Sequence, residues 1–472
     1  MKQEYTIASN ESWLSLAHAQ LLKGTILFHF PALTITIITA LNKDADFSTS
    51  NLKAFTAEQP EATPHTFIQR GDIRNIAIFN KNIVTKITAG EPLQMAIDKA
   101  LPHQLFEKFL QKGLPKLNAT SVNIQLIATE DKIENALLNK DLDGCIVPLA
   151  SINVLLQYAP LRNQILHILA DKKWMLLPLF ECPPAVGQGV VVATTNLLNI
   201  DAITILEKCN NSAITATLKT EMDFAAMLTD AGDFGVFNLD TGTTKFSFAS
   251  GVDTKGNAFT NWDFEKSNVL RDKLLFSSTD YMKDFFSYQY LNDSNIDENI
   301  AAVFISSHKA IHSTELFNSI LQKRVWAAGT RTWYELAKKG IWVEGCADGL
   351  GMESLLATWQ IPLVNLTKKD FLIITNKAST LHWKADGWNT AATYELIPEP
   401  SEAIQEAIGN ADLIFWTSFQ QYEMYKAFVK PNAKHLCPAG KTAKLLLVAG
   451  FTPIIFPTIK AFLDWRNNYS GK

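Results

Sequence analysis

The sequence predicts an α/β protein made of several lobes, and three observations carry that prediction. Strand-like and helix-like apolar patterns alternate along the first half of the chain. The second half contains an internal repeat of strand, helix, strand and helix. The chain is 472 residues long, which is enough for about three domains of ordinary size.

The alternation begins at the N-terminus. Residues 5–8 are predicted to form a strand, and Ser9 or Ser12 is predicted to cap the helix that follows. His29 and Pro31 interrupt the apolar stretch 25–41, which predicts the end of a helix followed by a half-buried strand. Residues 42–66 are rich in Ser, Thr, Asp and Glu, so we expect a loop or an insert there.

Further strand–helix units follow in the first half. Strands are expected at 76–79, 122–128 and 144–149, with helices around 105–110 and 131–139. Residues 233–262 differ, because four glycines separate short strands, and this pattern predicts a small antiparallel sheet.

The repeat is the most informative pattern of the second half. Strand 303–307 ends in two serines, and 22 residues later Gly329 opens a Gly-Thr-Arg-Thr turn into a helix. Strand 413–418 ends in Thr-Ser, and again 22 residues later Gly440 opens a Gly-Lys-Thr turn into a helix. The two copies predict two similar α/β lobes with parallel sheets, whose strand ends form a cleft for a ligand.

Composition excludes several classes of protein. Apolar residues make up 47% of the chain and charged residues 19%, which excludes a largely disordered protein. A net charge of -4 and a pI near 6.2 exclude a strongly basic nucleic-acid binder. No apolar run is long enough to span a membrane, and no signal peptide is visible, so we expect a cytoplasmic protein. The five cysteines form no CxxC pair, so we expect reduced thiols and no metal site.

Hydroxyl groups and glycines recur where strands meet helix N-termini. Such ends offer free backbone N–H groups and a partial positive charge, which suit an anion. The alternative is that each Ser or Thr only caps its own helix. Other motifs fail: the Gly-Lys-Thr at 440–442 lacks the earlier glycine of a phosphate-binding loop, and His308 and His312 fit a surface pair better than a metal site.

The second half resembles uroporphyrinogen-III synthase over about residues 270–465. The resemblance rests on the order and spacing of five segments, which are 304–307, 327–332, 390–394, 415–418 and 439–442. It implies that hydroxymethylbilane is the substrate. The enzyme would expel its hydroxyl group and close the linear tetrapyrrole through a spiro intermediate that inverts ring D.

The first half is similar to hydroxymethylbilane synthase (porphobilinogen deaminase). The clearest segment is Pro-Pro-Ala-Val-Gly-Gln-Gly at 183–189, supported by 7–20, 143–156 and 221–224. The resemblance implies deaminase-like α/β domains at 1–90 and 91–200, a small α+β domain at 201–265 and a two-lobed synthase domain at 266–472.

The first half departs from the deaminase family at its functional positions. Asp233 stands where the family attaches its dipyrromethane cofactor to a cysteine, and Cys209 lies earlier in the chain. The segment with the catalytic aspartate has no counterpart between Phe47 and Ile83. The arginine clamps are also absent, with 129–132 in place of one of them and Asn10 in place of the N-terminal arginine. We therefore expect a deaminase fold without dipyrromethane and without deaminase activity.

The resemblance to the synthase also implies the site residues. Tyr394 matches the candidate acid that would protonate the departing hydroxyl, although a buried structural tyrosine is the alternative. Substrate-binding positions are Ser306, Ser307, Thr332, Ser418 and Thr442.

Two other functions stay open at this point. One is a bifunctional enzyme with both activities, and the other is a non-catalytic protein that binds a tetrapyrrole or docks a deaminase. A separate hydroxymethylbilane synthase is a candidate partner. Nucleic acid and membranes are not expected as partners.

Overall fold

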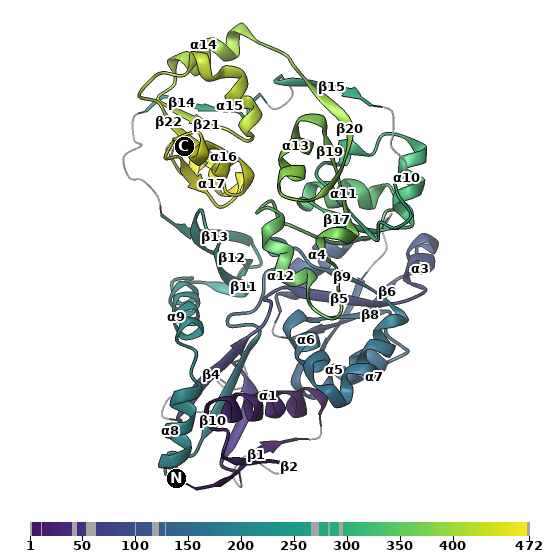
Figure 1. Cartoon of the computed structure of the whole chain (residues 1–472), viewed down its shortest axis with the longest axis vertical. Coiled ribbons are helices and arrows are strands. Elements are labelled where there is room, and N and C mark those ends of the chain that lie inside the picture. Colours follow the sequence, from purple (N-terminus) through teal and green to yellow (C-terminus); the bar gives the residue numbers. More distant parts are fainter. Residues whose placement is uncertain are drawn as a thin grey trace. The chain divides into compact units, whose positions relative to one another are not determined.

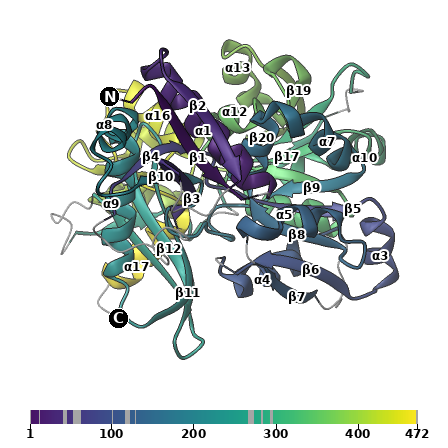
Figure 2. The ribbon, with the colours of Figure 1, turned by 90° about the horizontal axis from the view of Figure 1, so that it is seen from below.

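The computed structural model describes residues 2–10, 12–39, 45–52, 63–99, 101–115, 122–127, 129–265, 273–281, 284–291 and 296–469. The chain forms two compact units. The first comprises Met1–Asn238, Phe248–Asn261 and Ile361–Asn365, and the second comprises Leu239–Ser247, Trp262–Gln360 and Leu366–Lys472. Both contain sheets flanked by helices, which confirms the α/β class (Figure 1; Figure 2).

The first unit contains two five-stranded sheets. One has the order β2-β1-β3-β10-β4, and the other has the order β7-β6-β8-β5-β9. Strand β1 is parallel to β2 and β3, whereas β10 is antiparallel to β3 and β4. The strands are β1 (Glu4–Ser9), β2 (Thr34–Thr39), β3 (Phe47–Asn51), β4 (His65–Arg70), β5 (Asn75–Asn80), β6 (Leu93–Asp98), β7 (Val122–Ile127), β8 (Gly144–Pro148), β9 (Lys172–Leu176) and β10 (Val190–Thr195).

Helices cover both sheets. They are α1 (Trp13–His29), α3 (Ile83–Ala89), α4 (His103–Gly113), α5 (Thr129–Leu138), α6 (Leu149–Gln157), α7 (Ala159–Ala170), α8 (Ile200–Cys209) and α9 (Ser212–Ala226). Ser12, not Ser9, caps α1, because its Oγ accepts a hydrogen bond from the Ser15 N–H at 3.3 Å. The strands and helices predicted between residues 76 and 149 are confirmed.

The prediction of a loop over 42–66 is wrong at two places. Residues 47–51 form β3, and β4 begins at His65. Phe47 is buried and β3 pairs with β1 and β10, so tertiary pairing overrides the polar composition of this segment. Residues 42–44 and 53–62 of the predicted loop lie outside the described residues.

The deaminase-like run at 183–189 lies where the chain passes between the two sheets of the first unit. The Gln188 side chain donates to the Ile73 carbonyl at 2.8 Å and accepts from the Ala185 N–H at 3.1 Å. The buried carboxylate of Glu221 accepts from Arg70 at 2.7 Å and from the Gly187 N–H at 3.1 Å. These contacts hold the connecting segments of the two sheets together. Gln188 and Gly187 of this segment therefore have a structural role.

A three-stranded sheet follows in the order β11-β12-β13, with β11 at Ala231–Asp240, β12 at Lys245–Asp253 and β13 at Ala258–Phe264. Short turns containing Gly242 and Gly256, both with positive φ, join neighbouring strands. Strands joined by such short turns are antiparallel, as the glycine pattern predicts.

The second unit contains the repeat, in two sheets. The first sheet has the order β15-β20-β19-β16-β17-β18, and the second has the order β14-β21-β22-β23. Strands β16, β17 and β18 are parallel, and so are β21, β22 and β23. The prediction of two similar α/β lobes is therefore confirmed at the level of the elements.

The elements of the two lobes interleave along the chain. The strands are β14 (Leu275–Ser277), β15 (Phe286–Tyr290), β16 (Ala302–Ile305), β17 (Arg324–Ala327), β18 (Val343–Cys346), β19 (Phe371–Asn376), β20 (Asn389–Pro398), β21 (Leu413–Phe415), β22 (Lys434–Pro438) and β23 (Ile454–Phe456). The α-helices are α10 (Thr314–Leu321), α11 (Thr330–Lys338), α12 (Leu356–Trp359), α13 (Lys377–Ala385), α14 (Glu402–Asn410), α15 (Phe419–Tyr425), α16 (Lys441–Val448) and α17 (Ile459–Tyr469). Short 3₁₀ helices are η3 (His308–Ala310), η4 (Met352–Leu355), η5 (Lys368–Asp370) and η6 (Lys426–Phe428).

The strands of both copies are buried, which positions their carboxyl ends firmly. All four residues of β16 and all three of β21 are buried. In Figure 1, α13 lies along β19 and β20, and α16 and α17 lie beside β22. None of the described helices is both long enough and apolar enough to cross a membrane.

Candidate functional site

A cavity of about 810 Å³ in the second unit is lined by residues from both copies of the repeat. Its wall includes Ser306 and Gly329, which follow β16 and β17, and Thr417 and Ala439, which follow β21 and β22. Strand ends from both sheets therefore meet around one space. This is the position where parallel α/β sheets usually bind ligands.

Three helices begin at the wall of this cavity, and each carries a basic residue in its first turn. Arg331 lies in the first turn of α11, Lys441 in that of α16 and Lys460 in that of α17. None of these three turns contains an acidic residue. Acidic residues are favoured there, because a helix N-terminus carries about half a positive charge. The arrangement concentrates positive charge and suits a ligand with several anionic groups.

Glycines cap two of these helices, and they differ in conformation. Gly329 begins α11 in extended backbone that any residue can adopt. Gly440 begins α16 at φ 90°, and a Cβ there would lie 3.3 Å from the Leu350 carbonyl oxygen. Among the described contacts, neither end has a side-chain cap, so first-turn N–H groups stay available to a ligand.

Lys441 is half-buried in the cavity wall. Its ammonium lies 5.1 Å from the ring centre of Trp383, and burial lowers the pKa of Lys441, although Asp386 and Glu353 act to raise it. Lys444, one turn further along α16, donates to Glu353 at 2.8 Å. Burial acts to raise the pKa of Glu353, but the hydrogen bond from Lys444, a backbone hydrogen bond and the charges of Lys444 and Lys368 together hold this pKa below its usual value.

The structure brings some of the predicted substrate-binding residues to this cavity. Ser306 and Thr442 line it, whereas Ser307, Thr332 and Ser418 are not among its described lining residues. Ser307 caps η3, and Ser418 begins α15 with a capping box to Gln421. Both serines therefore act as caps, which is the alternative that the sequence left open.

Tyr394 lies behind Ser306. It belongs to β20 and is 4% exposed, and the side chains of Asn376, Ser307 and Ser306 lie near enough to its hydroxyl to act on its pKa. Burial raises the pKa of Tyr394 above its ordinary value, and these side chains act in the opposite direction. The phenol keeps its proton at neutral pH, and Ser306, one of its polar neighbours, lines the cavity.

Several cavity residues escaped the sequence interpretation. They are the basic residues Arg331, Lys441, Lys444 and Lys460 and the aromatic residue Trp383. The sequence does contain a pattern that could have identified the basic residues. A basic residue in the first turn of each helix contradicts the ordinary preference of helix N-termini for acidic residues. Two of these residues lie inside the Gly-Thr-Arg-Thr and Gly-Lys-Thr turns that define the repeat.

In the first unit, Asp233 pairs with a histidine. Asp233 Oδ2 lies 3.2 Å from Nδ1 of His103 at the start of α4, and both side chains are about one-third exposed. Cys209 is buried in α8. A carboxylate cannot form the thioether that holds dipyrromethane, so Asp233 does not fit this cofactor.

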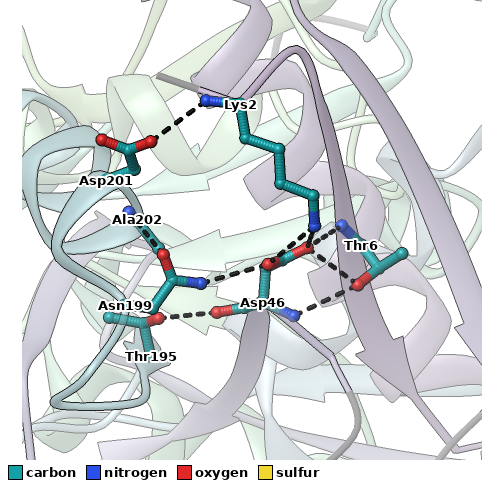
Figure 3. A network of polar contacts seen from close by, with 7 residues as sticks. All are labelled: Lys2, Thr6, Asp46, Thr195, Asn199, Asp201 and Ala202. Carbon is teal, nitrogen blue, oxygen red and sulfur yellow. Dashed lines mark hydrogen bonds and ion pairs between the residues drawn. The ribbon is translucent and has the colours of Figure 1, made fainter.

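A second carboxylate of the first unit, Asp46, is committed to structural contacts. It accepts hydrogen bonds from the Thr6 N–H at 2.8 Å, Lys2 Nζ at 3.2 Å and Asn199 Nδ2 at 3.1 Å (Figure 3). Burial acts to raise the pKa of Asp46, but the hydrogen bonds from Thr6 and Lys2 and the charge of Lys2 hold it below its usual value. Asp46 ties β1 to the start of α8 and is a poor proton donor at neutral pH.

Comparisons with known proteins add little to this geometry. A scan against protein-family models found no match, and a search of curated proteins found none. Among solved structures, uroporphyrinogen-III synthetase from Helicobacter pylori 26695 is 16% identical with a TM-score of 0.27, over 39% of this chain and 90% of that one. A periplasmic substrate-binding protein of an ABC transporter from Coxiella burnetii is 13% identical with a TM-score of 0.28, over 46% and 96%. The regulatory domain of MexT from Pseudomonas aeruginosa is 10% identical with a TM-score of 0.23, over 41% and 88%. Scores this low carry no argument about function.

Proposed function

We propose that the protein is a uroporphyrinogen-III synthase whose site is the cavity of the second unit, and that its first unit has no deaminase activity. The observation that carries the proposal is the convergence of three basic helix N-termini on one cavity shared by both copies of the repeat. The sequence resemblance supplies the substrate, hydroxymethylbilane, which carries eight carboxylates. Its carboxylates match the three basic helix N-termini, which share the wall with Asp348, Glu353 and Asp386. The volume of about 810 Å³ lies within the range of roughly 300–1,000 Å³ of ligand pockets.

Orientation is the main contribution that the reaction needs. Without an enzyme, hydroxymethylbilane closes to the type I isomer, so the protein must hold the chain in one curved conformation. First-turn N–H groups of α11 and α16 and the basic side chains would fix the carboxylates.

Proton transfer to the departing hydroxyl is the second contribution. Ser306 would give its proton to the leaving hydroxyl group and take the proton of Tyr394, so that water departs and the azafulvene forms. Asn376 and Ser307 would then stabilise the tyrosinate by hydrogen bonds. In the unliganded arrangement Ser306 donates to Thr375 Oγ1 at 2.9 Å, so its hydroxyl must rotate toward the substrate.

The isomer of the product tests the proposal. Hydroxymethylbilane would be generated by a separate deaminase in the presence of the full chain, and the oxidised uroporphyrins would be separated by chromatography. We expect type III in excess. Type I alone, at the spontaneous rate, would overturn the synthase proposal, and tight binding without type III would favour a non-catalytic tetrapyrrole-binding protein.

Two measurements test the inactivity of the first unit. Porphobilinogen should not be consumed by the protein alone, and denaturing mass spectrometry should show the mass of the unmodified chain. A covalent dipyrromethane adduct together with porphobilinogen turnover would establish the bifunctional alternative instead.

A further inference from the structure

Lys441 is a half-buried cation of the cavity wall, and the charges of Asp386 and Glu353 act on it without forming an ion pair among the described contacts. It is the first residue of α16, where the partial charge of the helix is also positive. Among the described residues, its ammonium has no ion pair and contacts the face of Trp383 instead. Lys444, by contrast, pairs with Glu353. An additional negative group beside Lys441 would therefore offset both the charge of its ammonium and the partial positive charge of the N-terminus of α16.

Trp383 gives this place a second chemical property. It belongs to α13, is half-buried and lines the same cavity as Lys441. An indole face binds another aromatic ring by stacking. Because the tryptophan side chain is rigid, little conformational entropy is lost when it is held in one orientation. Lys441 and Trp383 thus offer a charge and an apolar face side by side.

We propose that Lys441 and Trp383 form a subsite for one pyrrole ring and its acidic side chain, with the ring against the indole and the carboxylate on the ammonium. The identity of the whole ligand rests on the proposed function, but the subsite itself requires only an aromatic ring that carries a carboxylate. Lys441 leaves the face of Trp383 when the ring arrives, so its positive charge moves from the indole to the carboxylate. The first-turn N–H groups of α16 add hydrogen bonds to the same carboxylate.

A matched lysine–tryptophan pair outside the cavity provides the control. The Lys368 ammonium lies 5.0 Å from the ring centre of Trp388, at nearly the same distance, and it also donates to the Asp386 carbonyl at 3.0 Å. Neither Lys368 nor Trp388 is among the described residues that line the cavity. Replacement of Lys368 removes the same kind of contact without removing a cavity cation.

Direct binding of a small probe tests the subsite without any turnover. Porphobilinogen, a single pyrrole with two carboxylate side chains, would be titrated into the full chain and followed by ligand-detected NMR. Glutarate, which has two carboxylates and no ring, would be titrated in parallel. We expect Lys441→Met to weaken porphobilinogen binding about tenfold, as for a lost charged hydrogen bond. Trp383→Leu should weaken porphobilinogen binding several-fold and leave glutarate binding unchanged, and Lys368→Met should change neither.

The dependence of binding on pH is a second measurement. A carboxylate that binds beside Lys441 raises the pKa of its ammonium, so affinity is full below the pKa of the free protein and falls as the pH rises through it. Burial lowers that pKa, so the loss should begin at a less alkaline pH than for an ordinary lysine. Lys441→Met should remove this loss.

The outcomes separate this proposal from the synthase proposal. Equal porphobilinogen affinity for wild type, Lys441→Met and Trp383→Leu, with all three folded by circular dichroism, overturns the subsite even if type III product forms. A loss confined to the two cavity variants supports the subsite even if only type I product forms. Equal effects of Trp383→Leu on both probes would show that no ring is recognised, and would also overturn it.

Discussion

The two copies of the repeat share their elements but differ in the side chains that lie next to the equivalent strand ends. Behind Ser306 in the first copy lies the phenol of Tyr394, an ionisable group that holds a proton at neutral pH. Behind Thr417 in the second copy lie Ser278 and Gln421, which bind its N–H at 2.9 and 3.1 Å and do not ionise in this range. The second copy instead carries two lysines in and after its Gly-x-Thr turn, Lys441 and Lys444.

This difference teaches that two similar sets of elements can present different chemical groups at equivalent strand ends. Under the proposed function, the first copy would move a proton and the second would hold the charged groups of the substrate. Substitutions at equivalent positions of the two copies should therefore have unequal effects.

The largest effect is expected at Tyr394. Tyr394→Phe removes the proton donor and keeps the ring, so kcat should fall about 10²–10⁴-fold while the product stays type III. Tyr425 in the lobe of the second copy is equally buried, and its hydroxyl accepts from the Ser401 N–H at 3.1 Å. Tyr425→Phe should leave kcat unchanged. Steady-state kinetics on both variants decides the point, and a Tyr394→Phe protein with full kcat would make Tyr394 structural.

The next effect concerns the two capping glycines. Gly440→Ala should destabilise α16 by about 1–3 kcal/mol, because φ is positive there and the added methyl group meets the Leu350 carbonyl. Gly329→Ala, in extended backbone, should change stability by less than about 1 kcal/mol. Hydrogen–deuterium exchange of peptides covering α11 and α16 measures both. Equal protection in the two variants would show that the conformational difference has no energetic weight.

A smaller effect separates the two threonines of the Gly-x-Thr turns. Both are buried, but Thr442 lines the cavity and Thr332 is not among its described lining residues. Thr442→Val should raise KM roughly fivefold at constant kcat, as expected for one lost hydrogen bond. Thr332→Val should leave KM within about twofold of wild type. A larger rise in KM for Thr332→Val would mean that the first copy binds the substrate through this residue after all.

The smallest effect concerns the two capping serines. Ser418→Ala breaks the capping box with Gln421 and should cost about 1 kcal/mol of stability. Ser307→Ala removes a longer contact, from the Lys309 N–H at 3.4 Å, at the start of a three-residue turn, and should cost less. Thermal denaturation compares them, and a reversed order would make the Ser307 contact with Tyr394 more important than its cap.

The sequence predicted the framework of the molecule better than its chemistry. The repeat and the buried strands were readable because apolar runs and glycines mark elements by local rules. Strand β3 was missed because its polar residues pair only through distant partners. The caps at Ser307 and Ser418 could not be distinguished from ligand contacts, since both uses need the same residue types. Trp383 could not be assigned to the cavity, because only the packing of α13 brings it to Lys441.

The bridge between Lys444 and Glu353 bears on how fast a ligand can enter and leave. It joins α16 to η4, both of which line the cavity, and its side chains are 47% and 56% exposed. An exposed pair of this kind contributes at most about 1 kcal/mol, so thermal motion opens it for a substantial fraction of the time. The ion pair therefore does not keep the cavity closed. The residence time of a bound polyanion is set by the contacts that the polyanion itself makes with the protein. Added salt should shorten that residence by screening those contacts rather than by releasing a gate.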